Sequence, residues 1–267
     1  MRLCHIAPAS LLGWLRDRDE ELGHARSMHL IMAHVCEENP EYAAFYKRVA
    51  GEDYVILDNG AYELGAAAAD EMTLKWVKEL NPSEVVLSDK LFDRDETIKR
   101  SKAFLIKLQK LRFEGKTMAV PQGANAAEWF ECLESFRYRE DVHTIGVFLK
   151  AGSLFPEGRE DLLNRVKQLK RFGDKNWHLL GSDTMLWELQ RIPHLPVNAF
   201  IRSMDTTKFI TCGYAGVRVQ DVMAGTATYP ERQQDYFRLP FPEEKILEII
   251  DNNLNVAEQL LRKPWSF

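Results

Sequence analysis

The 267-residue chain contains 45% hydrophobic residues, which suits one large domain with a sizeable core and excludes any need for a disulfide or metal staple. A formal net charge of −5 argues against a protein that holds nucleic acid through its overall charge. The four cysteines form no Cys-x-x-Cys pair, which argues against a zinc knuckle and is typical of a reducing compartment. No stretch approaches the roughly 20 apolar residues of a spanning helix, and the N-terminus has no basic region before an apolar run. We therefore expect a cytoplasmic protein with no membrane partner.

Short aliphatic runs alternate with amphipathic stretches along the chain, a pattern that indicates strands separated by helices. The predicted strands are Arg2–Ile6, His29–Ala33, Tyr54–Leu57, Glu84–Ser88, Thr117–Pro121, Thr144–Leu149, Trp177–Leu180 and Ala199–Ser203. The predicted helices are a short one within Ala9–Arg18, then Asn39–Val49, Asp70–Leu80, Arg94–Arg112, Ala126–Phe136, Arg159–Phe172, Asp183–Gln190 and Glu243–Leu261. Parallel strands need crossover helices, and eight of them favour a closed barrel over an open sheet. The sequence predicts an α/β fold, a single (β/α)8 TIM-barrel domain over residues 1–267 with a C-terminal helix.

Residues 213–242 show little periodicity, so we expect a long loop there, a feature that is often functional. Two clusters of basic residues stand out, one within residues 94–116 and one within residues 165–171. Taken alone, each cluster is better explained by a solvated helix face than by a rim that tracks phosphates. The seven histidines show no metal-ligand spacing, and we expect them to be structural or at the surface.

Polar or glycine residues follow the ends of five predicted strands. They are Asp58, Asp89, Gln122, Gly181 and Asp205. In a barrel these positions share the C-terminal rim, where such enzymes carry their chemistry. Each aspartate taken alone is better explained as a helix cap or a turn former than as a site residue, and Gly123 and Gly181 can serve simply as turn residues. Taken together, the five positions predict three carboxylates, an amide and a glycine around one pocket.

Three carboxylates in one pocket suit the transfer of a sugar between two bases. One carboxylate can attack the sugar C1′ and form a covalent glycosyl intermediate, while a second handles the proton of the departing and arriving base. A third can accept the N–H donors on the N1/N2 edge of guanine. Gln122 and a backbone N–H can address O6 and N7, and the ring of Tyr62 can stack on the base.

Several of these motifs, in the same order over residues 55–207, resemble those of the tRNA-guanine transglycosylase superfamily. The Asp-Asn-Gly-Ala-Tyr segment at 58–62 resembles the family's Asp-Ser-Gly-Gly-aromatic motif, Pro-Gln-Gly at 121–123 its Val-Gln-Gly motif, and Leu-Gly at 180–181 its Met-Gly motif. The family's Gly-Gly-Leu segment after strand six is matched poorly by Val-Phe-Leu at 147–149.

The resemblance implies a role for each matched residue. Asp205 would be the nucleophile and Asp58 its general acid/base partner. The substrate-binding residues would be Asp89, Gln122, Gly123 and Gly181 at the guanine edge, and Tyr62 and Leu180 as the two sides of a base sandwich. No cofactor or metal is implied.

Two departures from the family bear on the substrate. The family's zinc site, a Cys-x-Cys-x-x-Cys run with a later His, is missing, and we expect no RNA-binding accessory domain after the barrel. A short chain without the zinc site resembles the phage-type 7-deazaguanine DNA transglycosylases. The resemblance therefore implies exchange of guanine in nucleic acid, DNA more than tRNA, for a free 7-deazaguanine base through a covalent aspartyl-glycosyl intermediate.

Three alternatives stay open at this point. The chain could act on tRNA, it could be a hydrolase that releases a base from a nucleoside, or it could be a non-catalytic partner subunit on the same fold. Activity on free nucleosides that is insensitive to salt would favour the hydrolase, because phosphate contacts make binding fall steeply with salt. Retention of all three aspartates speaks against the non-catalytic subunit.

Overall fold

The computed structural model describes residues 1–23, 27–65, 67–170, 174–182 and 186–262. Its eight strands are β1 Arg2–His5, β2 Met28–Met32, β3 Tyr54–Asp58, β4 Glu84–Val86, β5 Lys116–Ala119, β6 Thr144–Phe148, β7 Asn176–Leu180 and β8 Ile201–Thr206. All hydrogen-bonded neighbours are parallel, and their order is β1-β8-β7-β6-β5-β4-β3-β2. The end strands β1 and β2 also lie next to each other, so the sheet is a nearly closed barrel. The predicted (β/α)8 TIM barrel is confirmed.

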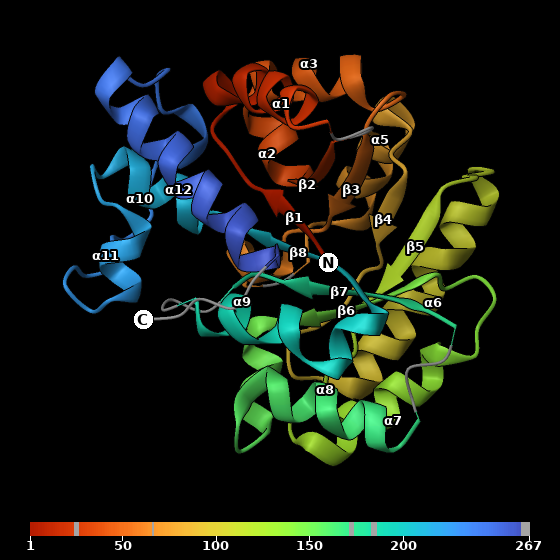
Figure 1. Cartoon of the computed structure of the whole chain (residues 1–267). Coiled ribbons are helices and arrows are strands. Elements are labelled where there is room, and N and C mark those ends of the chain that lie inside the picture. Colours follow the sequence, from red (N-terminus) through yellow and green to blue (C-terminus); the bar gives the residue numbers. More distant parts are fainter. Residues whose placement is uncertain (24–26, 66, 171–173, 183–185, 263–267) are drawn as a thin grey trace.

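Helices surround the strands on the outside of the barrel (Figure 1). The α-helices are α1 Leu12–Glu21, α2 Ala33–Glu38, α3 Pro40–Val49, α4 Ala61–Leu64, α5 Asp70–Leu80, α6 Arg94–Lys110, α7 Ala126–Arg137, α8 Gly158–Gln168, α9 Trp187–Arg191, α10 Lys208–Tyr214, α11 Val219–Met223 and α12 Glu244–Arg262. Short 3-10 turns are η1 Ala9–Leu11, η2 Leu149–Leu154, η3 Ile192–His194, η4 Pro196–Phe200 and η5 Tyr236–Arg238. The described helices include none with the length and apolar character required to cross a membrane.

Side-chain caps fix where three of the outer helices begin. The side-chain oxygens of Asn39, Asp93 and Asn125 accept hydrogen bonds from the backbone N–H three residues later, at the starts of α3, α6 and α7. These bonds satisfy backbone donors that have no partner within the helix. Asp93 and Asn125 lie between a strand end and the helix that follows it, so they fix the path of two βα loops at the C-terminal rim, whereas Asn39 separates α2 from α3.

The C-terminal helix packs against α10 (Figure 1). Asn253 is fully buried in this contact, and its side chain binds three backbone groups. Its Oδ1 accepts from the N–H of Val219 at 2.8 Å, and its Nδ2 donates to the carbonyls of Phe209 and Val217 at 3.1 and 3.0 Å. This one amide joins α12 to the segment between α10 and α11, so the predicted closing helix anchors the chain after β8.

A polar cluster fills the N-terminal end of the barrel interior. Arg202 forms an ion pair with the fully buried Glu84 at 2.8 Å. The hydroxyl of Tyr54 donates to Glu84 at 3.1 Å, and Arg202 donates to Tyr54 and to Thr144 at 3.1 and 3.3 Å. These four side chains come from β3, β4, β6 and β8, and together they close this end of the barrel.

The sequence-based assignments differ from the structure most clearly in three places. The eighth strand begins at Ile201 and continues to Thr206, because pairing with β1 extends it, so Asp205 lies inside the strand and not after it. Residues 213–242 are not one irregular loop, since α11 and η5 lie within them. The helix predicted over 183–190 is the shorter α9, and residues 183–185 lie outside the described part of the chain.

Candidate active site

A cavity of about 380 Å³ opens at the C-terminal ends of the strands. This volume lies within the range of small-molecule sites, which is about 300–1,000 Å³. Six of the eight predicted site residues line it: Asp58, Asp89, Gln122, Leu180, Gly181 and Asp205. Its apolar walls include Val86, Val120, Phe148 and Leu149. The cavity therefore combines apolar surface with a few convergent polar groups, as a site for a planar polar ligand requires.

Asp58 is the last residue of β3, and the turn after it is tightly built. Gly60 has a φ of +69°, a left-handed conformation that L side chains rarely adopt, and a Cβ there would overlap the ring of His34. The Nδ2 of Asn59 donates to the carbonyl of Leu87 at 2.8 Å, and its Oδ1 accepts from the N–H of Ala61 at 2.8 Å. The turn thus fixes the backbone immediately after Asp58.

The structure describes the backbone of the predicted stacking residue Tyr62 but not its ring. Its backbone belongs to α4, which follows the turn, but its side chain lies outside the part of the chain that the structure describes. Its predicted role stays a prediction.

Asp89 follows β4 and lies at the cavity wall, 2% exposed. One carboxylate oxygen accepts from the Nδ2 of Asn59 at 3.0 Å, and the other accepts from the Nε2 of Gln122 at 2.7 Å. Burial raises the pKa of Asp89 to about 6, against the lowering effect of these two hydrogen bonds. Each oxygen keeps a second lone pair, so the carboxylate can still accept the two N–H donors of a base edge.

Gln122 is fully buried, and its amide orientation is fixed by its neighbours. Its Oε1 accepts from the N–H of Phe92 at 3.1 Å, which leaves the Nε2 to donate to Asp89. Its second N–H has no partner among the described residues, so it can address an acceptor in the cavity. Gly123, predicted beside it as a substrate contact, does not line the cavity: a Cβ there would overlap the backbone N of Trp129 at the start of α7. The absence of a side chain at Gly123 therefore serves the packing of loop against helix.

Asp205 comes from β8 and is held by the neighbouring strand β7. Its Oδ1 accepts from the backbone N–H of Gly181 at 2.9 Å and from the Nε2 of His178 at 3.1 Å. Among the described residues, its Oδ2 has no hydrogen-bond partner. The carboxylate is therefore fixed through one oxygen, and the other is left for a ligand.

His178 is a functional candidate that the sequence reading missed, because the histidines were assessed only for metal-ligand spacing. The imidazole is fully buried. A signal was nevertheless present: side chains two apart in a strand share a face, so His178 accompanies Leu180 on β7 and Ser203 accompanies Asp205 on β8.

The ends of β6 and β7 are tied together by Arg159 of α8, whose side chain is fully buried. Its guanidinium donates to the carbonyls of Val147, Leu180 and Gly181 at 2.9, 2.9 and 2.7 Å. It also forms a two-pronged ion pair with Glu188 of α9. Because Gly181 donates to Asp205, Arg159 holds the backbone that orients the candidate nucleophile.

Cationic side chains stand at the cavity in the segment after β8. Lys208 and Arg232 both line it, together with Tyr229. The Nζ of Lys208 lies 3.8 Å from the centroid of the Tyr229 ring. Cations at the rim of an acidic cavity suit a ligand whose buried part is a base or sugar and whose outer part is anionic.

No arrangement of three or more His, Cys, Asp or Glu side chains suited to a metal ion occurs among residues 1–262 where these are described. A scan against protein-family models gives no match, and a search of curated proteins gives none either. The interpretation of the site therefore depends on its geometry.

Proposed function

We propose that this protein is a glycosyltransferase that exchanges a guanine base in nucleic acid for a free 7-deazaguanine base. The observation that carries the proposal is that Asp58, Asp89 and Asp205, from the ends of three different strands, line one cavity at the C-terminal end of the barrel. Base exchange needs a nucleophile, a proton carrier and a group that recognises the guanine edge, and these three acids can divide those roles.

The first half of the reaction breaks the bond between C1′ and the base nitrogen. The Oδ2 of Asp205 attacks C1′, and the electron pair of the glycosidic bond leaves with guanine, which takes a proton from Asp58. In the second half, Asp58 removes a proton from the incoming 7-deazaguanine. The base nitrogen then attacks C1′ and releases the Asp205 carboxylate, so the protein ends as it began.

Asp89 is the proposed reader of the base. A carboxylate in this position accepts the paired N–H donors of the guanine N1/N2 edge, whereas adenine presents an acceptor there and is rejected. The free N–H of Gln122 can donate to O6. Leu180, one of the apolar residues of the cavity, is the proposed packing surface for a base face.

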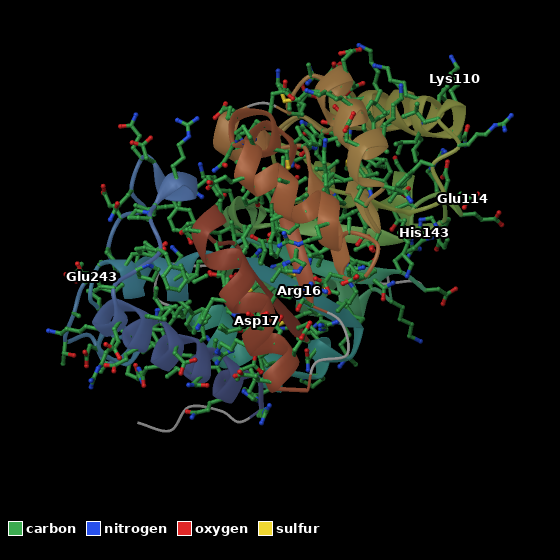
Figure 2. All side chains as sticks on the ribbon, turned by 90° about the horizontal axis from the view of Figure 1, so that it is seen from above. Arg16, Asp17, Lys110, Glu114, His143 and Glu243 are labelled. Atoms are coloured by element: carbon green, nitrogen blue, oxygen red, sulfur yellow. The ribbon has the colours of Figure 1, made fainter. Side chains whose placement is uncertain are left out.

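The rim cations favour a polymeric substrate over a free nucleoside. Lys208 and Arg232 line the cavity and would contact phosphates next to an extruded nucleotide. The predicted basic cluster on α6 is less suited to this role, because acidic side chains neutralise several of its members: Arg94 pairs with Asp95 and Glu131, and Arg100 pairs with Glu96. Lys110 lies at the outer edge of the molecule, on the side opposite Glu243 (Figure 2).

The decisive experiment incubates the protein with labelled guanine and either duplex DNA or tRNA, and measures both incorporated label and protein–nucleic acid adduct. Wild type is expected to incorporate label and to form an adduct, with DNA as the better substrate. Asp205→Asn keeps the side-chain shape but removes the nucleophile, so both signals should vanish. Asp17→Asn, a change on the exposed face of α1 (Figure 2), is the matched control and should behave as wild type.

The same assay separates the alternatives. An adduct that persists in Asp205→Asn removes Asp205 from its role. Label that enters tRNA but not DNA makes the protein a tRNA enzyme. Release of free base from nucleosides, without exchange and without salt dependence, identifies a hydrolase. For a polymeric substrate, Arg232→Gln should reduce the slope of log affinity against log salt by about 1.

A further inference from the structure

A chain of hydrogen bonds runs from the polar cluster at the N-terminal end of the barrel to the carboxylate of Asp205. The Nε of Arg202 donates to the Oγ of Ser203 at 3.2 Å. The Oγ of Ser203 lies 2.7 Å from the Nδ1 of His178, and the Nε2 of His178 lies 3.1 Å from the Oδ1 of Asp205. Ser203 and His178 are fully buried and are register partners on β8 and β7. The polar cluster at the N-terminal end is thus connected to the candidate nucleophile through two side chains.

The direction of the chain follows from its first member. Arg202 has no acceptor atom, so the Oγ of Ser203 must accept from it. The hydroxyl proton of Ser203 then needs an acceptor, and the Nδ1 of His178 is its partner among the described residues. An imidazole that accepts at Nδ1 is neutral and carries its proton on Nε2, and that proton is directed at Asp205.

From this geometry we infer that His178 is a positioning residue for Asp205. The Arg202–Ser203 pair keeps the imidazole of His178 as the Nε2–H tautomer. This N–H and the N–H of Gly181 together hold the Oδ1 of Asp205, so that its Oδ2 faces the sugar. The inference about catalysis rests on the proposed function, in which Asp205 attacks C1′. The inference about the tautomer does not.

The charged and titratable groups around this unit belong to three elements besides β7. Cys4 of β1 is paired in register with Asp205 and is fully buried, and burial and the nearby carboxylate raise the pKa of its thiol far above the usual value. Arg202 of β8 and Glu84 of β4 form the ion pair of the polar cluster. A cation anchored by its own carboxylate starts the chain, so Ser203 keeps a constant donor over the range in which enzymes are assayed.

The tautomer can be tested without any substrate. Long-range proton–nitrogen NMR correlations distinguish the Nε2–H, Nδ1–H and doubly protonated imidazoles, and the His178 signals are those absent from His178→Gln. We expect the Nε2–H pattern in wild type at neutral pH, and a mixture of tautomers in Ser203→Ala. An Nδ1–H or doubly protonated His178 in wild type, or an unchanged pattern in Ser203→Ala, would overturn the inference.

The positioning role is tested by kinetics of base exchange. In His178→Gln the amide can accept from Ser203 and donate to Asp205, so kcat should stay within about tenfold of wild type. His178→Phe keeps a ring but removes the donor, so kcat should fall by 100-fold or more while KM for guanine changes less than threefold. If the substitutions only damaged the structure, the folded fraction would fall, and His178→Gln would have a kcat no higher than that of His178→Phe. Equal kcat in Phe and wild type would sink the idea.

If His178→Phe does not fold, Ser203→Ala carries the kinetic test, with an expected fall in kcat of about tenfold and unchanged KM. His194→Phe is the control, because His194 contacts the carbonyl of Leu260 and does not line the cavity. The two proposals fail separately. Absence of any adduct or exchange in wild type removes the proposed function but leaves the NMR result standing, whereas a wrong tautomer in an active enzyme removes only the inference.

Discussion

The Nε2 of Gln122 donates a 2.7 Å hydrogen bond to the carboxylate of Asp89, which joins the ends of two adjacent strands across the cavity wall. Because the Oε1 of Gln122 is occupied by the N–H of Phe92, the amide cannot rotate to present its oxygen to the acid. The carboxylate is consequently held in one orientation before any ligand arrives, a condition that reduces the cost of binding.

Gln122→Met tests this arrangement. Methionine is close in shape but cannot donate, so Asp89 loses one of its two amide partners. Hydrogen bonds to charged groups contribute about 1.5–3 kcal/mol, which corresponds to roughly 10–100-fold weaker guanine binding by calorimetry. Gln109→Met, at an exposed position on α6, is the matched control and should leave the affinity unchanged. Unaltered affinity in Gln122→Met would show that Asp89 is oriented by other groups.

Guanine affinity should depend on pH through Asp89. Burial raises its pKa to about 6, so in the empty protein the carboxyl is largely protonated below that pH. The N–H donors of guanine bind the ionised form. Affinity should therefore rise as pH increases from 5 to 7, by up to about tenfold per unit below the pKa, and then level off. Asp89→Asn should abolish this dependence, and a wild-type profile that is flat would contradict the assignment.

Arg159→Met should destabilise the protein strongly. The change strands Glu188 and three backbone carbonyls at the ends of β6 and β7, and loss of one partner from a buried ion pair costs about 3–5 kcal/mol. Arg165→Met, on the same helix, removes an exposed pair with Asp161 and should cost less than about 1 kcal/mol. Urea titration followed by circular dichroism gives both values, and equal costs would refute the structural role of Arg159.

Alanine substitutions at two glycines of similar backbone conformation distinguish the cost of backbone strain from the cost of steric overlap. Gly60 and Gly65 have φ values of +69° and +74°, but only at Gly60 would a Cβ meet a neighbouring side chain, the ring of His34. Gly65→Ala should cost about 1–2 kcal/mol from backbone strain. Gly60→Ala should cost a further 1–3 kcal/mol from overpacking and should also weaken guanine binding, because the turn carries Asp58 and Asn59. Similar losses of stability in both variants would mean that His34 moves aside freely.

Much of the barrel could be predicted from the sequence, because most strands are short apolar runs and long amphipathic stretches separate several of them. All eight predicted strands overlap the observed ones. The end of β8 could not be predicted, because its Met-Asp-Thr composition resembles a turn and only pairing with Cys4 and His5 of β1 extends it. Helix α11 within residues 213–242 was not predicted either, because a helix of five residues shows too little periodicity to be recognised.

The candidate site divides in the same way. Residues at strand ends could be found from local sequence, since the C-terminal rim of a barrel collects them. Asn59, His178 and Arg159 were not predicted as site residues, because most of their partners lie 21–30 residues away in the sequence and come together only when neighbouring strands pair. Only His178 had a local signal, its place two residues before Leu180 on β7. Gly123 has a second explanation: a glycine at this motif position also permits close packing against α7.

The polar cluster of Arg202, Glu84, Tyr54 and Thr144 at the N-terminal end of the barrel affects how ligands can enter and leave the cavity. The cavity of about 380 Å³ opens at the other end of the strands from this cluster. In the proposed exchange, the departing base leaves the cavity before its replacement enters, while the sugar stays bound to Asp205. Double-displacement kinetics, with parallel lines in reciprocal plots, are therefore expected for the proposed exchange.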